Sequence, residues 1–239
     1  MYGYGYYGWG MDPTILLLVI GMLLSLAASA KLRSTFAVYK KVRSHSGITG
    51  AEAAQRILRA AGITDVQVVP IRGSLTDHYD PRTKTVNLSQ SVYGATSVAA
   101  IGVAAHECGH AMQDNEGYAP LRFRSALVPV ANFGSSLSWP LILLGLVFGG
   151  LGSPLVEIGI LMFSLAVLFQ LVTLPVEYNA SARAVRLLDA QGILAGEEVN
   201  GTRKVLNAAA LTYVAAAATS ILQLLRLIIL FGGRNRRDR

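Results

Sequence analysis

The 239-residue chain has little of the charge that covers an ordinary soluble protein. Only 15% of its residues are charged, whereas about 25% is typical of soluble domains. Hydrophobic residues make up 52%, and the mean hydropathy is +0.44. This composition excludes an ordinary soluble domain and indicates an integral membrane protein in contact with the lipid bilayer.

Cysteine and histidine are scarce as well. Cys108 is the only cysteine, which excludes a framework of intrachain disulfides. The chain also lacks any basic run interleaved with aromatic residues, although its net charge is +7. Membrane topology and lipid headgroups therefore account for the charge, and no nucleic-acid partner is expected. The four histidines are His45, His78, His106 and His110.

The sequence contains several long runs without any charged residue. Residues 13–30 form the first, and 18 residues are enough for a membrane-spanning helix. Ala28-Ser29-Ala30 also resembles a signal-peptide cleavage site. However, no Lys or Arg precedes the run and a basic cluster follows it, which is the opposite of a signal peptide's polarity. We predict an uncleaved transmembrane helix at 13–32, running from outside to inside, after a Tyr/Gly-rich tail at 1–12.

Two further uncharged runs are 125–156 and 158–176, and glycines and a proline at 149–154 mark the break between two helices. They predict a transmembrane helical hairpin at 125–176, whose turn has no Lys or Arg and therefore fits the non-cytoplasmic side. The apolar segment at 205–233 is long enough to span, but Arg226 interrupts it. It either crosses the membrane or packs on the soluble domain, and a basic tail at 234–239 follows.

The segments 33–124 and 177–204 have the composition of a soluble domain that the hairpin interrupts. Thr49 and Glu52 form a capping box for a helix that ends near Gly62. Residues 66–71 predict a strand, and the DP turn in HYDPRTKTVNLS predicts a hairpin. We expect Thr85–Ser89 to be an edge strand on which an extended substrate could pair. The fold class is thus mainly α, with a small α+β domain.

The stretch AAHECGHAMQ (104–113) ends a helix, predicted at 96–113, that is apolar on nearly all sides. His106 and His110 lie four residues apart and face the same way, so one metal ion can bridge them. Glu107 projects from the same side and is placed to act as the general base. Cys108 points to the opposite face and is expected to be a packing residue. Three buried ionisable groups would be costly without a metal.

A catalytic zinc needs a third protein ligand, and no histidine follows His110. The remaining route is a carboxylate from a second helix. Glu177 in LPVEYNASARAVRLL (174–188) is expected to open such a helix at a membrane exit, where the following alanines permit a close approach. Glu157 is the competitor, but it lies in the turn on the opposite side of the membrane. A glutamate at a helix start is also common for its favourable interaction with the helix dipole.

Together, HECGHAMQ, LTDHYDPRTKTVNLS and LPVEYNASARAVRLL resemble the bacterial YugP-type family of neutral zinc metallopeptidases. More distantly, the layout is similar to the HtpX heat-shock membrane proteases and the CAAX prenyl proteases. The resemblance implies a zincin-like domain of the gluzincin type, with His106, His110 and Glu177 as ligands of Zn²⁺ and Glu107 as the base. The more distant relatives carry E-x-x-x-D, whose Asp orients a ligand histidine, whereas this chain has Ser181 at that position. A hydroxyl raises the basicity of histidine less than a carboxylate does.

The sequence therefore predicts a membrane-embedded zinc endopeptidase whose site faces the cytoplasm. Its substrate would be a protein or peptide segment, unfolded or membrane-tethered. His78 is the first choice for stabilising the oxyanion, before Tyr79 and Tyr178, although a hairpin histidine bonded to Asp77 or Asp80 is the plainer interpretation. His45 lies in a polar loop and is expected to be solvated. The alternative function is a non-catalytic membrane zinc adaptor or scaffold. A lipid- or nucleic-acid-binding role would depend on the basic tail alone.

Overall fold

The computed structural model describes residues 12–150 and 153–232. Nearly all of the predicted Tyr/Gly tail and the whole basic tail at 234–239 lie outside the described residues. Among these residues, four helices are long and apolar enough to cross a membrane: α1 (Ile15–Tyr39), α5 (Ala119–Gly149), α6 (Pro154–Ala190) and α7 (Glu197–Phe231). Large apolar side chains such as Leu23, Phe133 and Leu161 point outward from them and are more than half exposed to the surroundings. Such surfaces are expected to face lipid, so the chain is a multi-pass membrane protein.

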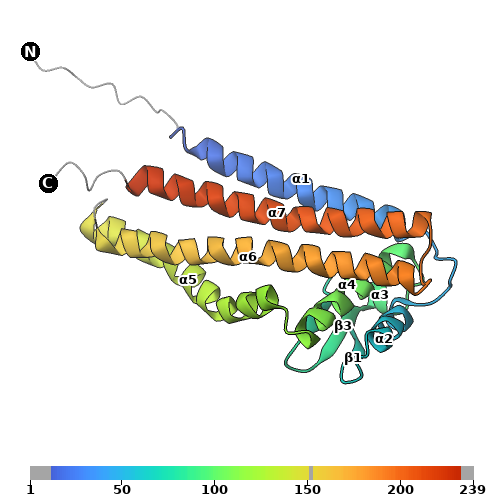
Figure 1. Cartoon of the computed structure of the whole chain (residues 1–239). Coiled ribbons are helices and arrows are strands. Elements are labelled where there is room, and N and C mark those ends of the chain that lie inside the picture. The colour runs from blue at the N-terminus through green and yellow to red at the C-terminus, as the bar shows by residue number, and fades with distance from the viewer. Residues whose placement is uncertain (1–11, 151–152, 233–239) are drawn as a thin grey trace, which may run out of the picture.

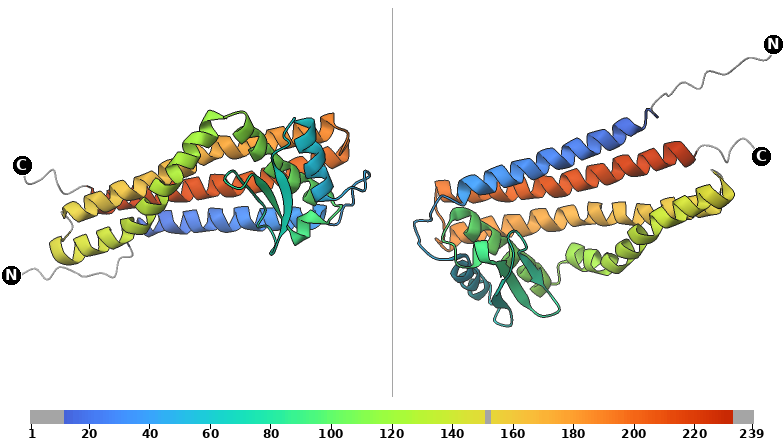
Figure 2. Two further views of the ribbon diagram at one scale, coloured as in Figure 1. Left: turned by 90° about the horizontal axis from the view of Figure 1, so that it is seen from below. Right: turned by 180° about the vertical axis from the view of Figure 1, so that it is seen from behind.

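The helices α1, α6 and α7 run side by side, and the small domain with the sheet lies at one end of them (Figure 1). The start of α1, the end of α7, the end of α5 and the start of α6 lie at the other end (Figure 2). Small residues join α1 to α7: the Thr219 hydroxyl donates to the carbonyl oxygen of Gly21 at 2.9 Å and lies 3.1 Å from the Ser25 hydroxyl. These contacts inside the bundle favour a retained membrane helix over a cleaved signal peptide.

The sequence leaves the placement of residues 205–233 open. In the structure, α7 packs along both α1 and α6. At the far end of the bundle, Arg226 of α7 forms an ion pair with Asp12, just before α1, at 3.5 Å. Packing within the helix bundle favours the spanning alternative over a helix that packs only on the small domain.

The expected helix start at Glu177 is wrong. The helix α6 continues without a break from Pro154 to Ala190, so Glu177 lies well inside it. The change in composition at Val176 marks the end of the apolar run. Pro175 lies inside the helix at this point, but the alanines that follow are strong helix formers and the helix continues through it. One helix therefore carries both the apolar run and the glutamate.

In the small domain, α2 (Gly50–Ala60) begins with the predicted capping box: Thr49 accepts from the backbone of Glu52, and Glu52 accepts from the backbone of Thr49. The strands are β1 (Gln67–Ile71), β2 (His78–Asp80) and β3 (Thr85–Ser89), in the order β1-β3-β2. The pair β1 and β3 is parallel, whereas β2 and β3 are antiparallel.

The expectation that Thr85–Ser89 forms an edge strand is wrong, because β3 is central and is paired on both sides. Because β1 pairs with β3 and not with β2, the two edge strands of the sheet are β1 and β2.

After the short helix α3 (Gln90–Tyr93), α4 (Val98–Asn115) crosses the middle of the domain. Ser97 caps it by accepting from the backbone of Ala100. Nearly every side chain of α4 is buried, as its apolar sequence predicts. Cys108 is completely buried and its thiol lies 3.6 Å from the carbonyl oxygen of Ala54, which confirms a packing role. The polar end of α4 is thereby held inside the protein.

Candidate metal centre

Three side chains from α4 and α6 converge in the structure. His106 and His110 lie one helical turn apart on α4, and Glu177 reaches them from α6. Oε2 of Glu177 is 3.2 Å from Nε2 of His106 and 3.6 Å from Nε2 of His110. All three possible ligand atoms lie within 4.8 Å of one another. Ligand atoms about 2.1 Å from a tetrahedral zinc ion are about 3.4 Å apart, so this donor set fits zinc.

A glycine allows the two helices to come this close. A Cβ atom at Gly109 would lie 2.5 Å from the carbonyl oxygen of Ala180. Ala180 and Ala184 of α6 are completely buried in this contact region. The small residues of both helices thus bring their backbones into direct contact beside the histidines.

Each histidine is held through its second ring nitrogen. Nδ1 of His106 lies 3.1 Å from the Ser181 hydroxyl, and Nδ1 of His110 lies 3.0 Å from Oε1 of Gln113. The Gln113 amide nitrogen donates to the carbonyl oxygen of Val176 at 2.8 Å and to Oδ1 of Asn179 at 3.0 Å. Because Oε1 of Gln113 can only accept, Nδ1 of His110 must carry the proton, and Nε2 is free to bind a metal.

The electrostatics of the centre favour a bound cation. Burial opposes a charge on His110, but its hydrogen bond with Glu177 and the nearby Glu107 carboxylate outweigh burial and raise the pKa of the imidazole. The second oxygen of the Glu177 carboxylate, Oε1, lies 3.8 Å from a guanidinium nitrogen of Arg124. Nε of Arg124 is buried and has no hydrogen-bond partner among the described residues. A metal ion can take the place of the proton that the two carboxylates attract.

Glu107 is next to the histidines and faces the edge of the sheet. Its Oε2 accepts a hydrogen bond of 3.1 Å from the backbone N–H of Tyr79 in β2. The Tyr79 hydroxyl and the Lys84 ammonium both donate to Asp114 at 2.8 Å and hold the hairpin against α4. Burial favours the neutral form of Asp114, but these two donors outweigh it and lower the pKa of the carboxyl. The outer edge of β2, which pairs with no other strand of the sheet, therefore lies over the candidate base, and its Tyr79 N–H is bonded to that base.

Two cavities meet at these residues. The first, of about 170 Å³, contains the histidines and both glutamates and is also lined by Asp77, His78, Leu121, Arg124, Ser125 and Tyr213. The second, of about 150 Å³, shares His106, Glu107, Asp77 and Tyr213 with the first. Its other walls are apolar and come mainly from α1, α4 and α7: Leu32, Phe36, Leu75, Val103, Val205, Leu206 and Ala209. The polar centre thus opens onto an apolar chamber.

The structure brings His106, Glu107, His110 and Glu177 together, as the sequence predicts. His78 lines the same cleft from β2, and its Nδ1 bonds the carbonyl oxygen of Thr76 at 2.9 Å instead of Asp77 or Asp80. Glu157 lies in the first turn of α6, about 30 Å along the helix from Glu177, and is too far away to compete. His45 has an exposed ring, as expected, and its Nδ1 also lies 2.8 Å from Oε1 of Glu198.

Sequence reasoning missed Arg124, Gln113 and Tyr213. Two of them carry a signal that could have pointed to them. Arg124 is the last charge before the 32-residue uncharged run, and Tyr213 is the single aromatic residue among the small residues of AALTYVAAA. Neither signal shows which helix each side chain contacts.

Comparison with known proteins agrees with this geometry. A family described as "Putative neutral zinc metallopeptidase" matches residues 14–232. The chain belongs to this family. It is also 49% identical over 217 residues to the "Putative membrane protease YugP" of Bacillus subtilis (strain 168), covering 91% of this chain and 96% of that protein. No solved structure matches the chain significantly. The family's description names zinc, and zinc is the metal that the donor set of His106, His110 and Glu177 fits.

Proposed function

We propose that the protein is a membrane-embedded zinc endopeptidase. The observation that carries the proposal is the convergence of His106, His110 and Glu177 within 4.8 Å, with the Glu107 carboxylate beside them in the same cleft. Two histidines and one glutamate are the protein ligands typical of a catalytic zinc, which keeps one position open. Family membership and the similarity to a putative membrane protease support the same function.

Zinc supplies a Lewis acid that makes water nucleophilic at neutral pH. His106, His110 and Glu177 would hold the ion, while Ser181 and Gln113 fix the orientation of the two imidazoles. Glu107 would accept the proton of the attacking water and deliver it to the leaving amine. Its hydrogen bond from the Tyr79 backbone holds the carboxylate in position for both transfers.

The oxyanion that develops at the scissile carbonyl needs donors besides the metal. Tyr213 lines both cavities and lies beside Glu177 and Glu107. His78 lines the cleft from the opposite wall, and its Nδ1 already has a partner. We assign the first donor role to Tyr213 and keep His78 as the second.

The walls of the site indicate the substrate. An extended segment could lie along the unpaired edge of β2, over Glu107, and use backbone hydrogen bonds. Next to the scissile bond, the chamber of about 150 Å³ would take an apolar side chain. Since α1 and α7 contribute to this chamber, the substrate is an unfolded or membrane-tethered segment that reaches the bilayer surface.

The distribution of charge supports a site on the cytoplasmic side. A basic cluster, Lys31 to Arg43, follows the uncharged run of α1 toward the small domain, and Arg122 and Arg124 precede the uncharged run of α5. Basic residues next to membrane helices favour the cytoplasm. A non-catalytic zinc adaptor is less favoured. A structural zinc site is closed by four ligands, whereas here the Glu107 carboxylate, which is not one of the proposed ligands, shares the cleft with three of them.

The experiment combines metal content with proteolysis of an unfolded protein such as casein, on protein purified in detergent. The variants are Glu107→Gln and Glu177→Ala, and the matched control is Glu197→Gln, which changes an exposed glutamate at the start of α7. We expect Glu107→Gln to keep zinc and lose cleavage, Glu177→Ala to lose zinc, and the control to behave as wild type.

Two results would contradict the proposal. If Glu177→Ala kept stoichiometric zinc, Glu177 would not be a ligand. If Glu107→Gln cleaved as fast as wild type, the observed proteolysis would come from another centre or a contaminant.

A further inference from the structure

A second groove lies between α1 and α7, on the opposite face of this helix pair from the apolar chamber. It has a volume of about 430 Å³. The chamber beside the metal centre uses Leu32 and Phe36 of α1, whereas the groove uses the neighbouring positions Lys31, Thr35 and Tyr39. The groove is therefore separate from the peptidase site.

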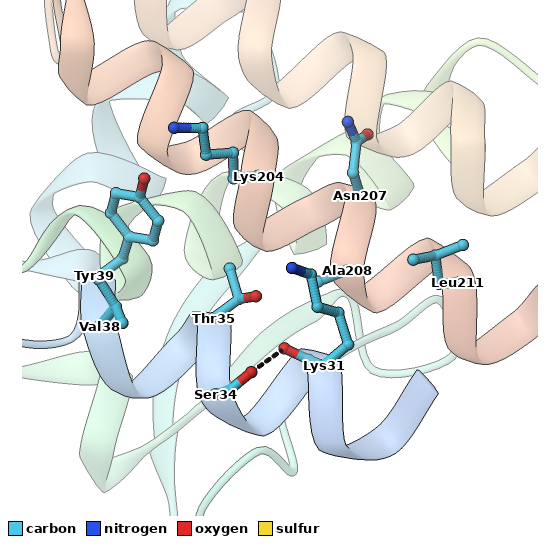
Figure 3. Close-up of a pocket in the computed structure, with 9 residues that line it drawn as sticks. All are labelled: Lys31, Ser34, Thr35, Val38, Tyr39, Lys204, Asn207, Ala208 and Leu211. Atoms are coloured by element: carbon cyan, nitrogen blue, oxygen red, sulfur yellow. Dashed lines mark hydrogen bonds between the residues drawn. The ribbon is translucent and has the colours of Figure 1, made fainter. Parts of the chain in front are cut away.

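The groove carries two positive charges. Lys31 comes from α1 and Lys204 from α7, and Figure 3 shows the Lys31 side chain extending from α1 toward α7. Both residues are exposed. Within the described part of the chain, neither ammonium group forms an ion pair with a carboxylate. In residues 12–150 and 153–232, therefore, no carboxylate neutralises this pair of charges by an ion pair.

The position of the lysines relates the groove to the membrane surface. Lys31 is the first charge after the uncharged run 13–30 of α1, and Lys204 is the last charge before the uncharged run 205–225 of α7. Because α1 and α7 pack side by side along these runs, both lysines lie at the same end of the apolar region. That is the level at which phospholipid headgroups meet a membrane protein.

The remaining walls suit a lipid headgroup and its chains. Ser34, Thr35 and Asn207 offer hydroxyl and amide groups, while the exposed Leu211 continues the groove toward the apolar part of α7. We propose that this groove binds one anionic glycerophospholipid. Its phosphate lies between the lysines, its headgroup hydroxyls meet the polar side chains, and its acyl chains follow Leu211 along the α1–α7 seam.

The test measures lipid binding directly, by native mass spectrometry of the full-length protein in detergent. Phosphatidylglycerol is titrated against phosphatidylcholine with the same acyl chains. The groove variant is Lys31→Gln/Lys204→Gln. The control Lys40→Gln/Lys41→Gln removes the same charge from exposed lysines that do not line the groove. A further variant, Asn207→Asp, adds a negative charge to the groove and keeps both lysines.

We expect the groove variant and Asn207→Asp to lose about tenfold or more in affinity for phosphatidylglycerol, and the control to stay within about twofold of wild type. Equal losses in the groove and control variants would overturn the proposal, as would equal binding of phosphatidylcholine. Displacement of the lipid by millimolar inorganic phosphate would identify a site for soluble phosphate instead. Zinc content and thermal unfolding confirm that each variant is folded, and neither readout depends on peptidase activity.

Discussion

Gly109→Ala is expected to weaken zinc binding, because the added methyl group would force α4 and α6 apart at the metal centre. The new Cβ would lie 2.5 Å from the carbonyl oxygen of Ala180 and 3.0 Å from its Cα and carbonyl carbon. Ordinary contact begins at 3.4 Å, and the atoms in the way are backbone, so no side-chain rotation can relieve the clash. The helices would have to separate by about 1 Å, whereas zinc–ligand distances tolerate only about 0.2 Å.

From this displacement we expect zinc affinity to fall by about 10–100-fold, the range seen when the groups that orient metal ligands are removed. The free energy of unfolding should fall by about 1–3 kcal/mol, as for other overpacked cores. Affinity is measured by competition with a chromophoric chelator, and stability by thermal unfolding with and without zinc.

Gly94→Ala is the matched control. Gly94 follows α3 at a φ of −97°, and a Cβ there would meet nothing within 4 Å. Wild-type zinc affinity in Gly109→Ala would refute the reasoning, since it would mean that the contact between α4 and α6 does not set the distance between the histidines and Glu177.

Three further predictions concern the same site. Ser181→Ala should lower zinc affinity about tenfold by freeing His106, and Ser181→Asp should restore it, as a chelator titration will show. Tyr213→Phe should keep zinc but lower kcat about 100-fold if its hydroxyl stabilises the oxyanion, which steady-state kinetics on a peptide will measure. Ala209→Leu should fill the apolar chamber and lower kcat/KM about tenfold for peptides with a large apolar side chain next to the cleaved bond. Peptides with alanine there should be cleaved as before.

The features that depend on a few neighbouring residues could be read from the sequence. The capping box of Thr49 and Glu52 and the burial of α4 are local, and the structure confirms them. The pairing of His106 with His110 also follows from one helical turn. Glu177 could be proposed without any knowledge of packing, because no histidine follows His110 and the alanines after Glu177 permit a close approach of two helices.

The features that depend on distant contacts could not be read in this way. The strand order β1-β3-β2 depends on the parallel pairing of β1 with β3. Turn residues predict hairpins but not parallel pairs, so the prediction that Thr85–Ser89 is an edge strand is wrong. Tyr213 reaches the metal centre only because α7 packs between α1 and α6. Apolar periodicity shows that a helix is buried or faces lipid, but it does not identify its neighbours.

The order of the proposed ligands along the chain has a consequence for the protein's biogenesis. His106 and His110 precede the pair of apolar helices α5 and α6, and Glu177 lies beyond the apolar run of α6. The ribosome therefore makes two ligands before the hairpin and the third only after it. Glu177 can meet the histidines only when α5 and α6 have folded back on each other, as they are packed in the structure. A newly made chain that has not yet been inserted would thus lack the complete ligand set, and the proposed peptidase would become active only after insertion into the membrane.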